Sequence, residues 1–329
     1  MKKITHLFLL TLFTIILVAC GNESEDAGST QASGKGEKLV VNIANLGFSP
    51  LNVAKETGLL EEELAKHNAT FEYSIHQNGP PINEGIASKR VDFAVLGEGA
   101  ILGGANNNLD TKLLSLAADG KVGINSIITT KDSGIKSVKQ LKGKKIAVAF
   151  GTSHQVFLLK VLDQEGLSAD DVTLVNLSVS DAHPAFQTAQ VDAWVTADLY
   201  ANIEAANGAV LIANGSQYDI YSPNFYVARG EFAEKHPEIV KSILVAINRA
   251  NELLKTDEDQ YYEVAAKAIG QEVETLRSLE TYELLNDVPS EELLDQLQES
   301  TVILKELEYL TNDIDIRSLL DTSYIESIQ

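Results

Sequence analysis

Short apolar runs recur along most of the chain, each followed by a glycine or a small polar residue and then by a helical pattern. The clearest run covers residues 144–150, is apolar after its two lysines, and is closed by Gly151-Thr152-Ser153. A continuous apolar run of this length is typical of a strand buried in a parallel sheet. A second unit contains a strand over 172–178, a helix start at 180–184 and a strand over 191–195. Ligands bind in the crevice outside the carboxyl ends of such strands, so these turns indicate a binding site.

The alternation of strands and helices extends on both sides of these two units. Apolar runs before them predict strands at residues 39–44, 71–76, 91–96, 112–118 and 124–130. One more strand is predicted at 225–229, and from Glu231 onward the pattern is helical throughout. We therefore expect an α/β protein built from Rossmann-like units.

The predicted elements group into two lobes joined by two crossing segments. A polar stretch with a glycine at 131–134 is the expected first crossing, and the strand at 225–229 is expected to return the chain. Lobe 1 then comprises residues 39–130 and 225–329, and lobe 2 comprises 131–224. A short internal repeat also suggests two related lobes. In each copy of this Val-Asp repeat a predicted helix is followed by a strand that begins with Val-Asp, at Val91-Asp92-Phe93 and at Val191-Asp192-Ala193.

The first 38 residues are predicted to form a processing signal and a tether. Lys2-Lys3 precede an apolar run from Leu7 to Val18, which is too short for an ordinary membrane-spanning helix. Leu17-Val18-Ala19-Cys20 looks like a bacterial lipobox, so residues 1–20 are predicted to be a lipoprotein signal peptide and Cys20 to carry the lipid. Residues 21–38 lack large apolar side chains and are predicted to be a flexible tether.

Charge and cysteine content exclude several classes of function. The chain of 329 residues has a formal net charge of -21, which disfavours nucleic acid and anionic membrane surfaces as targets. Cys20 is the only cysteine, so neither an internal disulfide nor thiol catalysis is expected. The acidic residues of the C-terminal helices lack the spacing of a calcium loop and are interpreted as a solvated surface, so no metal or cofactor is predicted.

Catalysis is weakly supported by the residues. No nucleophile elbow, phosphate-binding loop or pair of histidines at metal-ligand spacing is present in the sequence. His154, Asp181 and His183 could be grouped as catalytic residues, but a histidine at a helix start more often forms a structural hydrogen bond.

Anion binding is better supported, because five predicted turns each precede a helix start. Unpaired backbone N–H groups and the positive end of the helix dipole lie there and attract an anion without a basic side chain. The turns are at Ser49, Gly79, Gly97, Gly151 and Ser180.

Some side chains near these turns have two possible roles. Thr152 and Ser153 could donate to a ligand or cap the following helix. Trp194, the only tryptophan, could cover an alkyl chain of a ligand or pack in the core. The same alternatives hold for Phe48, Tyr200, Tyr221 and Phe225.

Taken in order, several motifs resemble the extracytoplasmic substrate-binding proteins of ABC importers for nitrate, taurine and aliphatic sulfonates. They are Gly79-Pro80 with Glu84-Gly85-Ile86-Ala87 and Val91-Asp92-Phe93, then 141–148, Gly151-Thr152-Ser153-His154, Val191-Asp192-Ala193-Trp194, and 225–229 with 232–237. The resemblance covers most of the chain from Leu39. It implies a type II periplasmic-binding-protein fold, a monomer that closes on one small organic anion, and delivery to a membrane permease with its own ATPase.

The resemblance also implies a ligand site. Gly151, Thr152 and Ser153 are expected to contact the anionic head of the ligand, with Gly79, Glu98 and Trp194 nearby. The full set of predicted ligand-binding residues is Asn45, Phe48, Ser49, Gly79, Pro80, Gly97, Glu98, Gly151, Thr152, Ser153, His154, Asp181, His183, Trp194 and Asp198.

The chain departs from the sulfonate binders at positions that bear on the ligand. After Trp194 that family usually has a second tryptophan followed by Asp-Pro, whereas here the matching residues are Ala197, Asp198 and Leu199. Because alanine is much smaller than tryptophan, we expect a larger pocket and a bulkier ligand than a short alkanesulfonate. The alternatives are a carrier of a pyrimidine or thiamine precursor and, from another class, an enzyme of the same fold.

Overall fold

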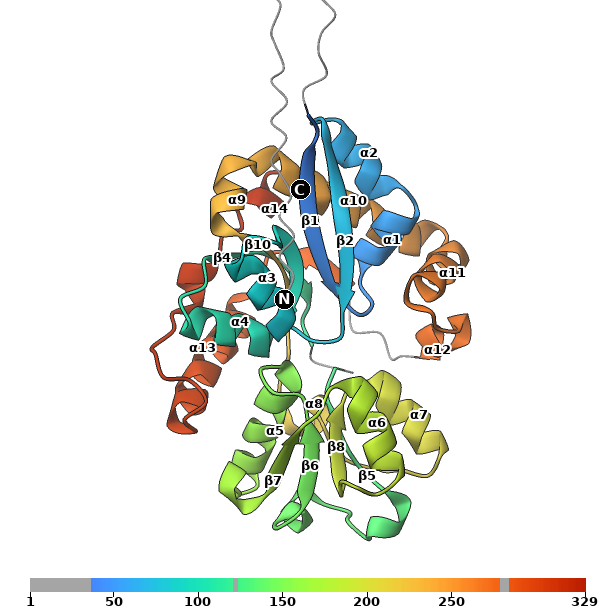
Figure 1. Cartoon of the computed structure of the whole chain (residues 1–329), viewed down its shortest axis with the longest axis vertical. Coiled ribbons are helices and arrows are strands. Elements are labelled where there is room, and N and C mark those ends of the chain that lie inside the picture. Colours follow the sequence, from blue (N-terminus) through green and yellow to red (C-terminus); the bar gives the residue numbers. More distant parts are fainter. Residues whose placement is uncertain (1–36, 121–123, 279–283) are drawn as a thin grey trace, which may run out of the picture. The chain divides into compact units, whose positions relative to one another are not determined.

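The computed structural model describes residues 37–120, 124–278 and 284–329, and residues 38–329 form one unit (Figure 1). The predicted signal peptide, most of the tether and Cys20 lie outside the described residues. No helix in the described ranges is long and apolar enough to cross a membrane.

The first sheet has six strands in the order β11-β4-β10-β3-β1-β2. Strands β1, β2 and β3 run parallel, and β10 is antiparallel to both of its neighbours, β3 and β4. The bounds are β1 Leu39–Leu46, β2 Ala69–His76, β3 Phe93–Gly97, β4 Thr111–Ala118, β10 Asn224–Arg229 and β11 Leu284–Asp287.

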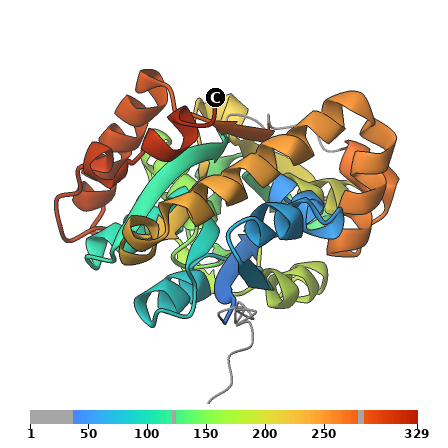
Figure 2. The ribbon, with the colours of Figure 1, turned by 90° about the horizontal axis from the view of Figure 1, so that it is seen from above.

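Helices cover both faces of this sheet and bury its apolar residues. One face packs against α1 Pro50–Glu56, α2 Leu59–Ala65, α10 Pro237–Thr256 and α11 Glu258–Ile269 (Figure 2). The other packs against α3 Pro80–Ala87, α4 Glu98–Asn106 and α13 Glu291–Glu306. In α10 the buried positions include Ile239, Ile243, Ile247 and Ala250, a spacing that places one apolar stripe against the sheet.

The second sheet has five strands in the order β7-β6-β8-β5-β9. Strands β7, β6 and β8 are parallel, whereas β5 is antiparallel to β8 and β9. The bounds are β5 Ser126–Thr129, β6 Lys145–Val148, β7 Thr173–Asn176, β8 Ala193–Thr196 and β9 Val210–Asn214, with helices α5 Ser153–Gln164, α6 Val179–Gln187, α7 Asp198–Ala206 and α8 Gly215–Tyr218. The predicted α/β class with two sheets is confirmed.

Two expectations about the sheets are wrong. The strand expected at 124–130 does not belong to lobe 1, because β5 pairs with β8 and β9 in the second sheet and the chain has crossed before Ser126. The region after Glu231 is not helical throughout, because β11 pairs with β4 at the edge of the first sheet. The remaining helices are α9 Gly230–Lys235, α12 Val273–Ser278 and α14 Ser323–Glu326.

The Val-Asp repeat forms the same contact in both sheets. The carboxylate of Asp92 accepts a hydrogen bond from the backbone N–H of Asn42, and the N–H of Asp92 donates to the carbonyl of Asn42. In the second sheet, Asp192 exchanges the equivalent pair of bonds with Lys145. Each aspartate thus ties the start of its strand to the neighbouring parallel strand.

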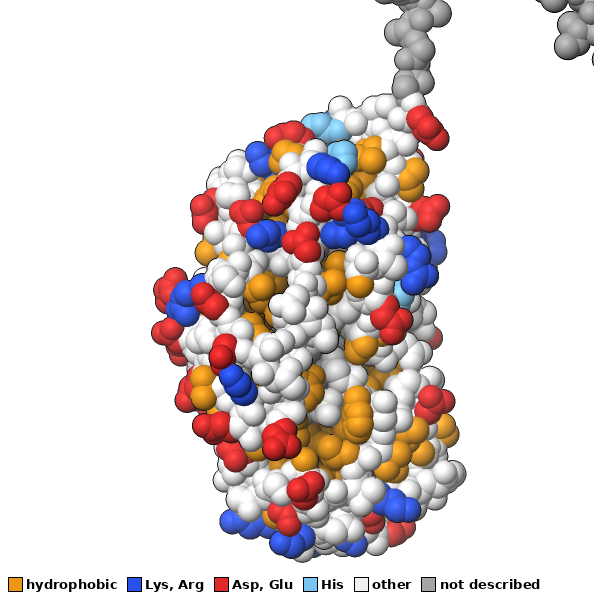
Figure 3. Space-filling view, turned by 60° about the vertical axis from the view of Figure 1, so that its left-hand side comes forward, with side chains coloured by type: hydrophobic (Ala, Val, Ile, Leu, Met, Phe, Trp, Pro, Cys, Tyr) orange, Lys and Arg blue, Asp and Glu red, His pale blue; other side chains and the backbone are white. Residues whose placement is uncertain are grey.

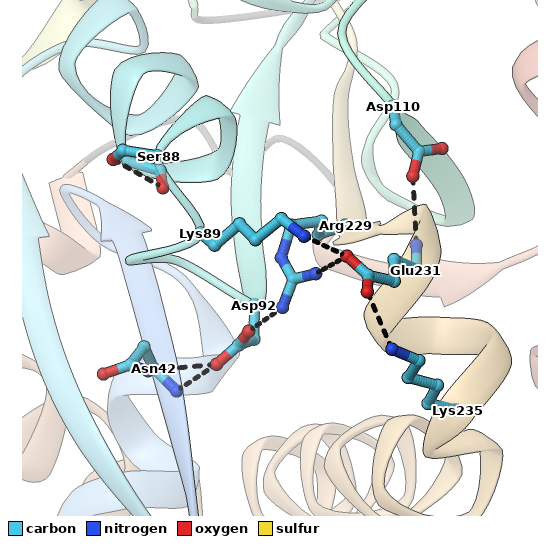
Figure 4. A network of polar contacts seen from close by, with 9 residues as sticks. Asn42, Ser88, Lys89, Asp92, Asp110, Arg229, Glu231 and Lys235 are labelled. Atoms are coloured by element: carbon cyan, nitrogen blue, oxygen red, sulfur yellow. Dashed lines mark hydrogen bonds and ion pairs between the residues drawn. The ribbon is translucent and has the colours of Figure 1, made fainter.

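In the first sheet this contact extends into a larger charge network (Figure 4). Arg229 on β10 donates to Asp92 at 2.6 Å and to Glu231 at 3.2 Å. Hydrogen bonds from Lys235 and Lys89 lower the pKa of Glu231 to about 2. The network joins β1, β3, β10 and α9. On the face of the molecule drawn in Figure 3, acidic and basic side chains are interspersed.

Candidate ligand-binding site

A cavity of about 460 Å³ is lined by residues from both sheets and from their helices. Its wall contains turns that follow β1, β2 and β3 of the first sheet and β6 and β8 of the second. The residues that line it are Leu46, Gly47, Phe48, Ile75, His76, Gln77, Asn78, Gly79, Gly97, Ala100, Ile124, Ala149, Thr152, Ser153, His154, Val179, Ala197, Leu199, Tyr200, Asn224, Ala268, Ile269, Gln271 and Leu276.

Five helices begin at the wall of this cavity. The N-cap residues of α3, α4, α5 and α7 line it, and so does the first residue of α6. These residues are Gly79, Gly97, Thr152, Ala197 and Val179. The first N–H groups of a helix have no partner within the helix and carry the positive end of its dipole. Their convergence makes this wall suitable for a negatively charged group.

The side chain of Thr152, the N-cap residue of α5, does not cap the helix. The hydroxyl of Thr152 donates to the carbonyl of Ala149 at 2.6 Å and makes no capping bond to the helix. The hydroxyl of Ser153 accepts a long bond of 3.4 Å from the N–H of Gly99, at the start of α4. The single hydroxyl hydrogen of Thr152 is therefore used within the protein, so in this structure the side chain neither caps α5 nor donates into the cavity. The backbone of the first turn of α5 remains at the cavity wall.

His154 is held in one orientation beside this turn. Its Nδ1 contacts the side-chain oxygen of Asn125, and the amide nitrogen of Asn125 donates to the hydroxyl of Ser222 at 2.6 Å. Burial lowers the pKa of His154 to about 4, so the ring is neutral at neutral pH. A neutral ring that donates from Nδ1 retains Nε2 as an acceptor. Asn125 and Ser222 thus fix the orientation of the His154 ring at the cavity wall.

Apolar side chains from both lobes form the rest of the wall. Leu46, Phe48, Ile75 and Leu276 come from the first lobe, and Leu199 and Tyr200 from the start of α7 in the second. Ile75 is 51% exposed although it is a large apolar residue. The cavity thus combines helix starts with large apolar side chains, and His76, Gln77, Asn78, Asn224 and Gln271 add polar groups to its wall.

Six predicted site residues line the cavity: Phe48, Gly79, Gly97, Thr152, Ser153 and His154. Ala197, the residue expected to enlarge the pocket, also lines it.

Several predicted residues support the wall from behind or lie elsewhere. Asn45 and Ser49 are buried and bonded to each other at 2.9 Å, which shapes the turn between β1 and α1. Pro80 and Gly151 lie against each other across the two lobes. Asp181 is exposed and accepts a bond from Ser178 in the first turn of α6.

His183 and Trp194 are not in the cavity wall, which corrects the prediction for both. The Nε2 atom of His183 lies 2.6 Å from the carboxylate of Glu204. Trp194 is 1% exposed, stacks on His183 with 5.7 Å between ring centroids, and belongs to a hydrophobic cluster beneath α6 and α7. Its position on β8 places the indole on the face covered by these helices. Trp194 therefore supports Tyr200, whose ring lies 5.7 Å away and lines the cavity.

Glu98 is also absent from the wall of this cavity. It is 1% exposed and pairs with Lys160 at 2.9 Å, so the pair joins the first residue of α4 to the second half of α5. Glu98 and Lys160 line a separate cavity of about 230 Å³, to which Tyr221 also contributes. Phe225 lies in the core of the first sheet. The side chain of Asp198 lies outside the described part of the structure.

The sequence interpretation missed residues that reach the cavity from other segments. His76 ends β2, Gln77 and Asn78 follow it, and Asn224 begins β10. The strand-then-glycine pattern that ends at Gly79 was a usable signal for the first three. No local signal marks the segment after α11, because its contact with the cavity depends on how the C-terminal helices pack. Among the described residues, no group of three or more His, Cys, Asp or Glu side chains is placed to hold a metal ion.

Comparison with known proteins agrees with the resemblance in the sequence. A family model described as "NMT1/THI5 like" matches residues 47–260. The "Putative aliphatic sulfonates-binding protein" of Bacillus subtilis (strain 168) is 33% identical over 331 residues, which covers 99% of this chain and 96% of that protein.

Solved structures confirm the fold. The alkanesulfonate-binding protein SsuA from Xanthomonas axonopodis pv. citri, bound to MOPS, matches with a TM-score of 0.78 and 23% identity over 87% of this chain and 99% of that chain. The desulfurization enzyme DSZB matches with a TM-score of 0.64 and 15% identity over 88% of this chain and 98% of that chain. The predicted periplasmic-binding-protein fold is therefore confirmed, and one fold serves both a binding protein and an enzyme. Since the family model covers more than half of the sequence, the chain belongs to the NMT1/THI5-like family.

Proposed function

We propose that this protein is the extracytoplasmic binding component of an ABC importer and captures a small organic sulfonate between its two lobes. The observation that carries this proposal is the convergence of five helix starts on one cavity that is also lined by large apolar side chains. The relative in Bacillus subtilis, named for binding aliphatic sulfonates, supports the choice of ligand class.

The chemistry of a sulfonate fits both parts of the cavity. Its three oxygens accept hydrogen bonds and carry one negative charge, which suits backbone N–H groups and helix dipoles. Its organic part needs an apolar environment, which Phe48, Ile75 and Ile269 provide. The hydroxyl of Ser153 and the backbone N–H groups of the first turn of α5 are the proposed donors to the sulfonate head.

The cellular setting is also a proposal. We infer that Cys20 is lipidated and holds the protein at the outer face of the cell membrane, where a permease with a separate ATPase receives the ligand. The lipobox sequence Leu17-Val18-Ala19-Cys20 supports the anchor. Labelling with a radioactive fatty acid, compared between the wild type and Cys20→Ser, tests this part independently.

A carrier of a pyrimidine or thiamine precursor is the second candidate. It needs aromatic rings on both sides of a flat ligand, and Phe48 and Tyr200 are the aromatic side chains with that opportunity in the described wall. Trp194 is buried and does not offer a stacking face. An enzyme like DSZB is disfavoured because Cys20 is the only cysteine and because the pKa of His154 is too low for a base at neutral pH.

A thermal-shift screen tests the proposal. Taurine, alkanesulfonates, MOPS, nitrate, bicarbonate and a pyrimidine precursor would each be added to the purified protein. A ligand at a hundredfold above its dissociation constant stabilises the folded state by about 2.7 kcal/mol, which is a readily measured shift. Stabilisation by sulfonates supports the proposal, and a response to the pyrimidine alone replaces it with the second candidate. Recovery of the sulfonate chemically unchanged after incubation excludes turnover.

A further inference from the structure

The described wall of the cavity contains no side chain with a permanent charge. None of the residues that line it is Asp, Glu, Lys or Arg, and only His76 and His154 can gain a positive charge. An anion that leaves water for this cavity needs compensation for its lost hydration, and the helix starts carry only partial charges. Within the described wall, the two histidines are therefore the only residues that can offer the anion a full positive charge.

His154 is placed and oriented for this role. It is the second residue of α5, beside the first-turn N–H groups of that helix. Its Nδ1 contacts Asn125, which is bonded to Ser222, and these two residues are 3% and 1% exposed. Nε2 has no hydrogen-bond partner among the described residues, so it is the ring atom that remains for a ligand in the cavity.

The protonated ring suits an anion, whereas the neutral ring does not. The side-chain oxygen of Asn125 can only accept, so Nδ1 carries the hydrogen and Nε2 of the neutral ring presents a lone pair. A sulfonate has no hydrogen to donate, and its oxygens would face this lone pair. A proton on Nε2 turns the same atom into a charged donor, which forms a charge-assisted hydrogen bond with an oxyanion.

The empty and the occupied cavity favour opposite forms of the ring. In the empty cavity, burial lowers the pKa of His154 to about 4. The positive end of the α5 dipole also disfavours a second positive charge at this position. An anion at the α5 start reverses the sign of the local field, and an adjacent opposite charge moves a pKa by about 1–3 toward the charged form.

Among the described residues, other charges near the α5 start do not take the place of this proton. Burial alone accounts for the low pKa of His154. Glu98 at the start of α4 is already paired with Lys160 of α5, and Asp181 on α6 is exposed to solvent. Tyr200 on α7 lines the cavity but cannot carry a positive charge.

We propose that binding of the anion is coupled to uptake of one proton at Nε2 of His154, so that the imidazolium becomes the cationic partner of the sulfonate. This inference rests on the proposed function, because the cavity must first hold an anion. A sulfonate stays ionised from pH 5 to pH 8, so the proton comes from the solvent and returns to it when the ligand leaves. Capture therefore tightens as the pH falls.

Isothermal titration of the purified protein with methanesulfonate and 1-butanesulfonate at pH 5, 6, 7 and 8 tests the inference. A rise of about two in the pKa of His154 on binding makes the dissociation constant about tenfold lower at pH 5 than at pH 8. At pH 5 and 6, the heat of binding is also expected to differ between two sulfonate-free buffers of different ionisation enthalpy. Equal dissociation constants at pH 5 and pH 8, without a buffer-dependent heat, overturn the inference but leave the proposed function intact. Failure of both sulfonates to bind at every pH overturns both.

Three variants locate the proton. His154→Gln is expected to bring the ratio of dissociation constants between pH 8 and pH 5 close to one. His76→Gln is expected to keep the tenfold ratio, because Nε2 of His76 already lies 3.0 Å from the hydroxyl of Ser74. His67→Gln is the matched control, since His67 is exposed and does not line the cavity. A thermal melt at each pH checks that the variants are folded, and the buffer-dependent heat of the wild type tests the coupling without any variant. A full ratio in His154→Gln, or loss of the ratio in His76→Gln, overturns the assignment to His154.

Discussion

Gly99, at the start of α4, is where the two lobes approach most closely at the helix starts. A Cβ atom placed on Gly99 would lie 2.2 Å from the carbonyl carbon of Thr152, 2.4 Å from its oxygen and 2.6 Å from the nitrogen of Ser153. These are backbone atoms of the α5 start, which cannot rotate away as a side chain can. Gly99→Ala therefore requires the starts of α4 and α5 to move apart by at least 1.2 Å, from 2.2 Å to the 3.4 Å of ordinary contact.

The cost of this displacement appears either in stability or in binding. If the lobes keep their arrangement, overpacking lowers the free energy of unfolding by about 1–3 kcal/mol. If the lobes separate instead, the same energy is needed to close them on a ligand, and the affinity falls roughly 5- to 150-fold. Urea denaturation and isothermal titration with an alkanesulfonate together measure both quantities.

The control for this prediction lies in the same helix. A Cβ atom placed on Gly103 would have no neighbouring atom within 4 Å, so Gly103→Ala meets no obstacle. Because alanine favours a helix interior over glycine, this variant should gain about 0.5–1 kcal/mol of stability with unchanged affinity. If Gly99→Ala matches Gly103→Ala in both stability and affinity, the close approach of the two helix starts is refuted.

Three further substitutions test other contacts. Glu98→Gln leaves the buried ammonium of Lys160 uncompensated and should lower the free energy of unfolding by about 3–5 kcal/mol. Lys139→Gln removes an exposed ion pair and should change the free energy of unfolding by less than about 1 kcal/mol. Equal effects of the two variants in urea denaturation contradict the buried pair. The pKa of His154 is about 4 in the folded protein and 6.5 for an unperturbed histidine, so its contribution to stability declines as the pH falls from 6.5 toward 4. Between pH 7 and pH 5, the free energy of unfolding of the wild type should fall by about 2 kcal/mol more than that of His154→Gln. Equal decreases in the two proteins refute this reasoning. Trp194→Ala should lower stability by about 3–5 kcal/mol, and a large loss of sulfonate affinity with stability retained would instead place the indole in the binding site.

The sequence predicted the parts of the fold that local patterns control. The apolar run that ends before Gly151 is β6, and the helix predicted after it is α5. The Val-Asp repeat was taken from the sequence only as a sign of two related lobes, and the structure shows an equivalent aspartate contact at each copy. The glycine and hydroxyl turns marked the helix starts that line the cavity.

The errors concern features that depend on distant parts of the chain. Strand β5 has the same local pattern as a strand of the first sheet, and only its pairing with β8 and β9 assigns it to the second. Trp194 was ambiguous because strand alternation does not say which face of a sheet borders a crevice. Ile269 ends the amphipathic helix α11, and it reaches the cavity through the packing of that helix on the first sheet.

The central claim is that a sulfonate binds with its head at the helix starts between the two lobes. The most direct test is a crystal structure of the protein with 1-hexanesulfonate. The account predicts the sulfonate oxygens within hydrogen-bond distance of the first-turn N–H groups of α5, next to Thr152 and Ser153, with the alkyl chain against Ile75. A sulfonate bound outside this cavity, or bound with its alkyl chain at the α5 start, would contradict it.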